Sequence, residues 1–189
     1  TVEKGGRIAV ADTADEIRKS LRDVTSAGMQ TLGIVFLVLW LFLGWREALL
    51  ASLAVPFTLF ISFIILKLNG ITLNGISLFS LILALGLLVD NAIVVIDGIY
   101  SKKHIGSLAD HATDTVSEFF KPLATGTLTT VAAFFPMLLV SGIIGEFLRT
   151  IPIVLTATLL SSLFTATILL PSVAVRFFKG HAITSENRW

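Results

Sequence analysis

The stretch "GLLVDNAIVVID", residues 86–97, places two acids and an amide inside a run that is otherwise apolar. From Leu68 to Ile96, the only ionisable side chain is that of Asp90. On membrane-insertion scales, an aspartate at the centre of a span costs about 2.5–3.5 kcal/mol, and such residues usually face a bundle interior or a wet cavity. The stretch therefore predicts a membrane-spanning helix whose acid serves a function.

The composition of the whole chain is typical of a membrane protein. Hydrophobic residues make up 54% of the 189 residues and charged residues 14%, with a mean hydropathy of +0.89. The net charge of +1 provides no field that would attract nucleic acid. The absence of cysteine excludes a disulfide framework and a thiolate metal site. We expect the lipid bilayer as the main partner, and no nucleic acid, metal or organic cofactor.

Charge-free length locates the membrane spans, because roughly 20 apolar residues cross about 30 Å of hydrocarbon. A buried helix of a soluble protein would show a polar face, and the run "IVFLVLWLFL" (34–43) shows none. We therefore predict an all-α membrane protein with a transmembrane domain over residues 24–175. Its five predicted spans cover residues 24–45, 48–66, 74–97, 122–141 and 150–175.

Three segments flank or connect the spans. Residues 1–23 begin as a strand and continue as a helix lead-in, where Thr13 and Glu16 have the spacing of a capping box. They are predicted to be the end of a water-exposed domain. Residues 101–121 form an amphipathic helix with an acidic stripe, and residues 176–189 mix basic and aromatic side chains as interfacial anchors do. The chain starts without a methionine or a signal peptide, which suggests a piece of a longer protein.

Basic residues near the span ends predict the orientation, because short cytoplasmic loops carry an excess of lysine and arginine. Five such residues lie on the side of the N-terminal segment and seven on the other side. This excess places residues 1–23 outside the cytoplasm, and residues 101–121 and 176–189 on its cytoplasmic side.

Asp90 meets the physical requirement of a proton relay. Burial disfavours the charged form of a carboxyl group and a nearby cation favours it, so a carboxyl under both influences can exchange a proton. Gly86, one turn earlier, would let another helix come close, and Asp97 returns to nearly the same face nearer the headgroups. Thr127 and Thr130 are candidate hydroxyl partners, although bonding their own helix backbone is the commoner role. The competing interpretation of Asp90 is interhelical packing by hydrogen bonds.

The sequence offers little support for an enzyme. An aspartyl intramembrane protease needs two deep acids on facing helices, and only Asp90 is deep. The chain lacks the His-Glu-x-x-His motif of zinc proteases, and we expect His104 and His111 to be solvated rather than metal-binding. No lysine or arginine lies within the predicted spans, so a cation for Asp90 would come from another segment. We expect no enzymatic activity.

Several stretches, in order, resemble the resistance–nodulation–division (RND) transporters of bacterial inner membranes. "GLLVDNAIVVIDGI" (86–99) looks like the fourth transmembrane helix of that family, and "TLTTVAAFFPMLLVSGIIGEFLR" (127–149) like its fifth helix and following loop. "LWLFLGWREALLASLAVPFTLF" (39–60) resembles helices two and three, and "ILLPSVAVRFF" (168–178) the end of helix six. The resemblance implies the last part of a periplasmic porter domain followed by helices two to six of the first half. The first helix, both large periplasmic domains and the second half lie outside this chain.

The resemblance also implies a function. RND family members couple proton entry to substrate export, with protons as the coupling ion, and work as homotrimers with a periplasmic adaptor and an outer-membrane channel. Asp90 matches the first of an adjacent acidic pair that senses protons against a lysine in the second half. Asn91 occupies the second acidic position, and Asp97 replaces a residue that is often glutamate. Alternatives are another RND-fold protein, such as a protein-export accessory or lipid handler, and an assembly subunit that transports nothing.

Overall fold

The computed structural model describes residues 18–19, 22–23, 25–30, 32–34, 36–38, 40–41, 44–101 and 108–178. Every regular element in these ranges is a helix, which confirms the predicted all-α membrane fold. The strand expected within residues 1–23 lies outside the described residues, and of the interfacial segment predicted at 176–189 only residues 176–178 are described, as the end of a helix. The elements are α2 (Trp45–Leu68), α3 (Gly75–Ser101), α4 (Leu108–Phe134), the 3₁₀-helix η1 (Phe135–Leu139), α5 (Ile143–Phe164), the π-helix η2 (Thr165–Leu169) and α6 (Leu170–Phe178).

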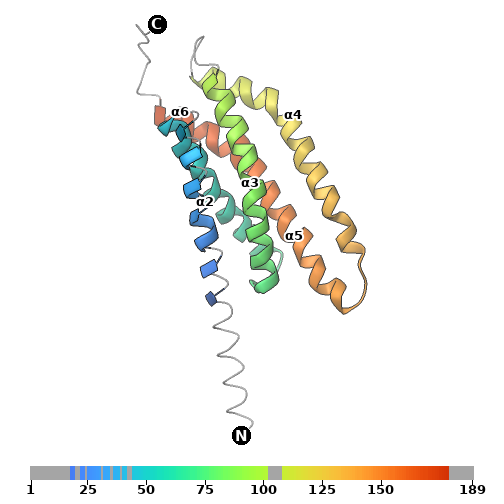
Figure 1. The fold of residues 1–189 in the computed structure, drawn as a ribbon. Helices are drawn as coiled ribbons and strands as arrows, with labels where there is room; N and C mark the ends of the chain where they lie inside the picture. The colour runs from blue at the N-terminus through green and yellow to red at the C-terminus, as the bar shows by residue number, and fades with distance from the viewer. Residues whose placement is uncertain are drawn as a thin grey trace, which may run out of the picture.

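The third helix is the centre of the bundle. α3 packs against α2, α4 and α5, and Figure 1 shows α2 and α4 on opposite sides of it. α4 lies at the margin, since only 6% of its apolar stretch is buried, against 44–61% for the other three long helices. The helix that carries Asp90 therefore packs against α2, which precedes it in the chain, and against α4 and α5, which follow it. α4, in contrast, has most of its surface exposed.

Four helical stretches are long and apolar enough to cross a membrane. They cover Glu47–Leu68, Gly75–Ser101, Asp110–Leu139 and Ile144–Arg176, and the predicted spans 48–66, 74–97, 122–141 and 150–175 are shorter by three, three, ten and seven residues. The span predicted at residues 24–45 corresponds to described pieces of a shorter apolar helix over Thr25–Val38. Charge-free length thus located these helices, and the added turns are the polar ends that a length criterion omits.

The fourth span differs from its prediction in one respect. We expected a separate amphipathic helix over residues 101–121, followed by a span that begins at Pro122. The structure instead has one continuous helix, α4, with Pro122 in its interior. A proline removes a single helical hydrogen bond, and membrane helices tolerate this loss where neighbours satisfy the freed backbone. The amphipathic pattern itself is present: Asp114 and Glu118 are exposed, while Ala112 and Thr115 are buried.

A second proline shapes the end of the last span. The amide of Leu170 donates to the carbonyl of Thr165, five residues earlier, which is the hydrogen bond of a π-turn. Pro171 follows directly and has no amide to donate, and its ring would collide with the carbonyl of a regular preceding turn. The widened turn makes room for the ring, so the helix passes from α5 into α6 without a break.

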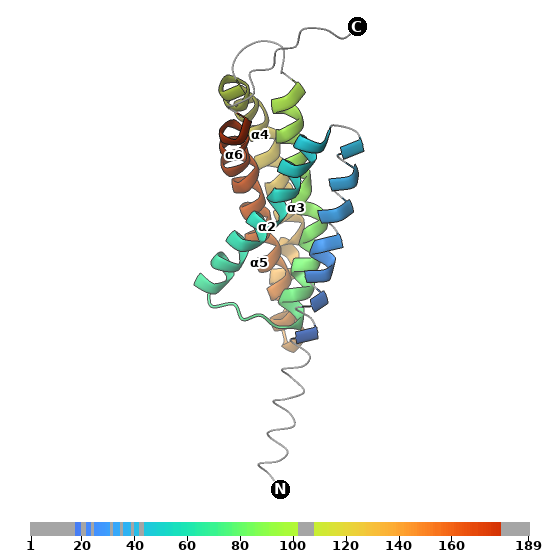
Figure 2. The same ribbon diagram turned by 90° about the vertical axis from the view of Figure 1, so that its left-hand side faces the viewer.

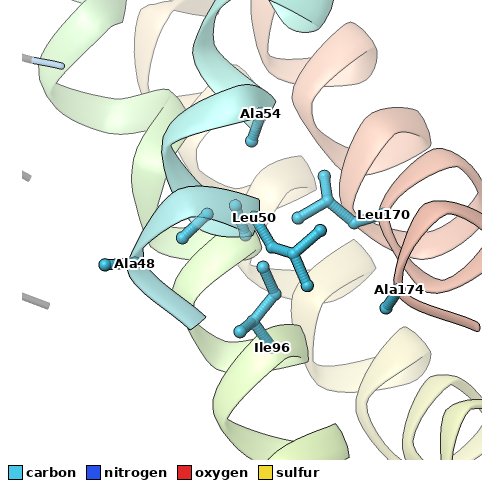
Figure 3. Close-up of a cluster of buried hydrophobic side chains, with 8 residues drawn as sticks. Ala48, Leu50, Ala54, Ile96, Leu170 and Ala174 are labelled. Carbon is cyan, nitrogen blue, oxygen red and sulfur yellow. The ribbon is translucent and has the colours of Figure 1, made fainter. Parts of the chain in front are cut away.

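Small residues bring α2, α3 and α6 together. Figure 3 shows Leu50 of α2 between Ile96 of α3 and Leu170 of α6, and Ala48, Ala54 and Ala174 belong to the same buried cluster. All are at most 3% exposed. Lipid tails are as apolar as leucine, so helix association in a bilayer depends on close packing, which alanine allows. This cluster fixes the end of α3 that follows Asp90.

Candidate functional site

Asp90 and Asn91 lie near the middle of α3 but belong to different surroundings. Adjacent residues of an α-helix point about 100° apart, because a turn takes about 3.6 residues. Both residues line a cavity between α3 and α4, but Asn91 is 9% exposed and contacts α5, whereas Asp90 is exposed. The amide is thus a buried interhelical group, and the carboxyl is the member of the pair that remains accessible.

A serine of α5 connects Asn91 to the backbone of α3. The Asn91 side-chain amide donates to Ser162 Oγ at 3.4 Å, and the Ser162 hydroxyl donates to the carbonyl oxygen of Leu88 at 2.6 Å. Ser162 and Leu88 are at most 1% exposed, so these polar groups are satisfied away from water. The two bonds join α5 to the turn of α3 that precedes Asp90. They hold α3 at the rotation that directs Asn91 to α5.

The sequence did not single out Ser162. The signal was present, however, since Thr158, Ser162 and Thr165 follow helical spacing within a charge-free span and all three are buried. Thr158 bonds the carbonyl of Val154, as an isolated hydroxyl in a helix usually does. Spacing alone does not distinguish such a residue from Ser162, which bonds a different helix.

The cavity beside Asp90 has a volume of about 240 Å³. It contains Thr127 and Thr130, the two threonines predicted as hydroxyl partners, and the structure places them on its α4 wall. Thr130 donates to the carbonyl of Gly126 at 3.0 Å. The remaining lining residues are Leu87, Asn91, Pro122, Leu123, Gly126 and Leu159. A space of this size has room for several water molecules, and the polar side chains of its mixed lining offer them hydrogen-bond partners.

Two other threonines of α4 bond their own helix. Thr125 donates to the carbonyl of Lys121 and Thr129 to that of Thr125, each at 2.8 Å. Both side chains are exposed. Thr130 also bonds its own helix, so what distinguishes Thr127 and Thr130 from these two is their place in the cavity lining.

Among the described residues, α3 approaches α4 closely at Gly98, and no helix comes close at Gly86. A Cβ atom at Gly98 would lie 2.6 Å from Thr115 Cγ2 and 3.0 Å from a ring carbon of Phe119, both on α4. At Gly86, an added Cβ would meet no atom within 4 Å among the described residues. Gly86 therefore leaves a surface of α3 open, and Asp97, which is exposed, sits one residue before the tight contact.

The expectation that His111 is solvated is wrong. Its side chain is 6% exposed, and Nε2 has no hydrogen-bond partner in the part of the chain that the structure describes. The residue lies on the same face of α4 as Ala112 and Thr115, which pack toward α3, and this packing buries it. His104 lies outside the described residues. Over the described ranges, no cluster of three or more histidine or acidic side chains could hold a metal ion.

Fold and site together define a multi-pass α-helical membrane protein with a carboxyl group at a cavity beside the middle of one span. The model of the AcrB/AcrD/AcrF family matches residues 6–189, so the chain belongs to this family. The membership confirms the resemblance to RND efflux permeases that the sequence stretches indicated.

Individual relatives are similar over most of the chain. Multidrug resistance protein MdtC of Pantoea ananatis is 34% identical over 177 residues, which is 93% of this chain and 17% of that protein. Multidrug resistance protein MdtF of Escherichia coli K12 is 33% identical over 89% of this chain, and swarming motility protein SwrC of Bacillus subtilis 31% over 90%. The chain spans about a sixth of the length of these curated relatives.

Proposed function

We propose that this chain is the part of a proton-coupled RND export permease in which Asp90 binds and releases the coupling proton. The observation that carries the proposal is the position of Asp90: it is the only acid in the central part of α3, and it lines a cavity between spans together with Thr127 and Thr130. Intramembrane acids in such positions commonly belong to ion or proton pathways. Membership in a family with multidrug resistance proteins supports export as the process that is driven.

The surroundings of Asp90 suit proton exchange. Water in the cavity, with the hydroxyls of Thr127 and Thr130, would carry a proton to and from the carboxyl group. The ionised form is costly in a bilayer unless a cation compensates it. The described lining of the cavity contains no lysine or arginine. We propose that the cation is the lysine that the family resemblance places in the second half of the permease.

Asn91 limits the number of protons that this site can bind in each transport step. An amide does not titrate, so the pair at positions 90 and 91 offers one carboxyl group instead of two. Asn91 is also bound to Ser162, which makes it a structural member of the α3–α5 contact. We propose one proton per transport step at this site, with Asp97 outside the relay because it is exposed at the end of the span, beyond the cavity lining.

The permease is proposed to lie in the bacterial inner membrane with residues 1–23 on the periplasmic side. The four described spans and the span predicted at residues 24–45 make five crossings, which put residues 1–23 opposite the side with the excess of basic residues. A homotrimer with a periplasmic adaptor and an outer-membrane channel follows from the family resemblance alone.

The first prediction tests the relay at Asp90. In proteoliposomes containing the full-length polypeptide, Asp90→Asn should abolish substrate-coupled proton flux, because the amide is similar in size but cannot bind a proton. The flux is read with a pH-sensitive dye under an imposed pH gradient.

Asp114→Asn is the matched control, since this acid is exposed on α4 away from the cavity lining. It should transport as the unmodified protein does. Thermal unfolding of both variants separates the relay from a packing role: equal stability with lost flux supports the relay. Full flux in a well-folded Asp90→Asn protein would refute it.

A further inference from the structure

A second cavity lies at the other end of α3, under the loop that joins it to α2. Its volume is about 520 Å³. Figure 2 shows the end of α2 diverging from α3, with the connecting loop spanning the space between them. The lining residues are Phe63, Leu66, Lys67, Gly70, Ile71, Thr72 and Leu73. This volume is within the roughly 300–1,000 Å³ of ordinary ligand pockets.

Backbone hydrogen bonds fix the end of α2, which forms part of the cavity lining. The amide of Ile71 donates to Leu66 O at 3.0 Å and that of Gly70 to Lys67 O at 3.1 Å, the paired bonds of a Schellman motif. Gly70 has φ +70°, the left-handed conformation that this motif requires and glycine adopts readily. The end of α2 therefore turns into the loop in one defined way.

The start of α3 is equally well defined. Asn74 Oδ1 accepts hydrogen bonds from the amides of Ile76 and Ser77 at 3.0 and 2.9 Å. Ser77 Oγ in turn accepts from the amide of Asn74 at 2.8 Å. This reciprocal capping satisfies amides that a helix N-terminus leaves unpaired. Both ends of the loop are thus anchored by local bonds, and a ligand would find the cavity already shaped.

The chemistry of the lining selects an amphiphile with a negative head. Phe63, Leu66 and Ile71 supply apolar walls, and Lys67 is the single charged residue among the lining side chains. Lys67 is exposed, so its ammonium group can meet a headgroup in water while an acyl chain occupies the apolar part. A neutral head would gain nothing from the lysine.

The cavity also lies at the depth of lipid headgroups. The apolar stretch of α2 ends at Leu68 and that of α3 begins at Gly75, so the loop between them marks a membrane surface. Leu68 is 81% and Leu73 40% exposed beside it, which suits contact with acyl chains rather than water. The geometry points to a binding site for one anionic phospholipid, whose acyl chain fills the cavity and whose phosphate pairs with Lys67.

This site is independent of the relay at Asp90 and can be tested without transport. Full-length protein is equilibrated in nanodiscs that contain phosphatidylglycerol and phosphatidylcholine, and lipid retained on the released protein is counted by native mass spectrometry. A lysine at a membrane surface strengthens binding of anionic lipid by about 1 kcal/mol, or about fivefold. Lys67→Gln should therefore lower phosphatidylglycerol retention about fivefold, to the level of phosphatidylcholine.

Three variants complete the design. Lys121→Gln removes an exposed lysine of α4 and should leave retention unchanged. Lys67→Arg keeps the charge and should retain phosphatidylglycerol. Thr72→Trp fills the cavity from its lining and should lower the retention of both lipids. Equal retention of the two lipids by the unmodified protein, or an equal loss with Lys67→Gln and Lys121→Gln, would overturn the assignment. Displacement of phosphatidylglycerol by a transported anionic amphiphile would also overturn it, because the site would then bind cargo.

Discussion

At the scale of residues, the central feature of the molecule is that Asp90 and Asn91 have different roles. The two side chains are neighbours in sequence and both line the cavity, yet Asp90 is exposed, whereas Asn91 is buried and bonded to α5. Ser162 maintains this division because its hydroxyl contacts both the Asn91 amide and the Leu88 carbonyl. A single hydroxyl group thus holds the acid-bearing turn of α3 in place.

Replacement of that hydroxyl gives a second prediction. Ser162→Ala leaves a buried carbonyl without its interhelical donor, and interhelical hydrogen bonds in membranes contribute about 0.6–1.7 kcal/mol each. The free energy of unfolding in mixed micelles should fall by about that amount. Proton-coupled flux should fall in part, since Asp90 remains but its helix is less firmly oriented.

Ser172→Ala is the matched control for this change. Ser172 is exposed and donates to Ile168 of its own helix at 2.6 Å, so its loss should alter neither stability nor flux. If the two alanine variants behave alike, the α3–α5 bond has no special role.

The sequence predicts which residues belong to the site better than it predicts the direction in which their side chains point. Asp90 stood out because an acid in an apolar run is costly, and Thr127 and Thr130 followed as nearby hydroxyls. Ser162 did not stand out, because serine in a membrane helix usually bonds its own backbone. Which side of α3 faces α5 also has no signal in the sequence, since the helix is apolar on nearly all sides.

At the scale of elements, the contact between α3 and α4 is tight at one end and open at the other. Gly98 meets Thr115 and Phe119, where no Cβ atom would fit without a shift. Toward the centre of the membrane the helices leave the cavity beside Asp90. α4 is therefore fixed near the end of α3 and leaves room for water farther along.

Two alanine substitutions on α3 test this arrangement. Gly98→Ala would place a methyl group against Thr115 and Phe119, and overpacking of this kind costs about 1–3 kcal/mol. At Gly86 no atom of the described residues would meet the added methyl group, and alanine is the better helix former, so Gly86→Ala should cost less than Gly98→Ala. Thermal unfolding of the full-length protein should rank them in that order, and equal effects would contradict the close contact at Gly98.

The course of α4 shows where element prediction from sequence ends. The amphipathic pattern of residues 101–121 and the apolar pattern that follows Pro122 are both real, and each indicates a helix. Their union into one helix depends on whether the backbone continues through Pro122, which local sequence does not decide. The π-turn before Pro171 is a similar case, because it reflects how a helix accommodates a proline inside a packed bundle.

At the scale of the whole molecule, the described helices form a bundle that leaves much apolar surface free. α4 is almost uncovered, and Asp90 and Gly86 lie exposed on α3. The fold class and the spans follow from charge-free length alone, because a bilayer requires about 20 apolar residues for each crossing. The cation that would compensate Asp90 cannot be found in the same way, since no described residue of the cavity lining supplies it.

The most direct measurement is the protonation of Asp90 itself. Infrared difference spectra of the full-length protein between acidic and alkaline conditions report the carbonyl band of protonated carboxyl groups. We predict a band that disappears in Asp90→Asn and persists in Asp114→Asn, with a single protonation step because Asn91 does not titrate. An unchanged spectrum in Asp90→Asn would show that this carboxyl exchanges no proton, and the relay would then have to be assigned elsewhere.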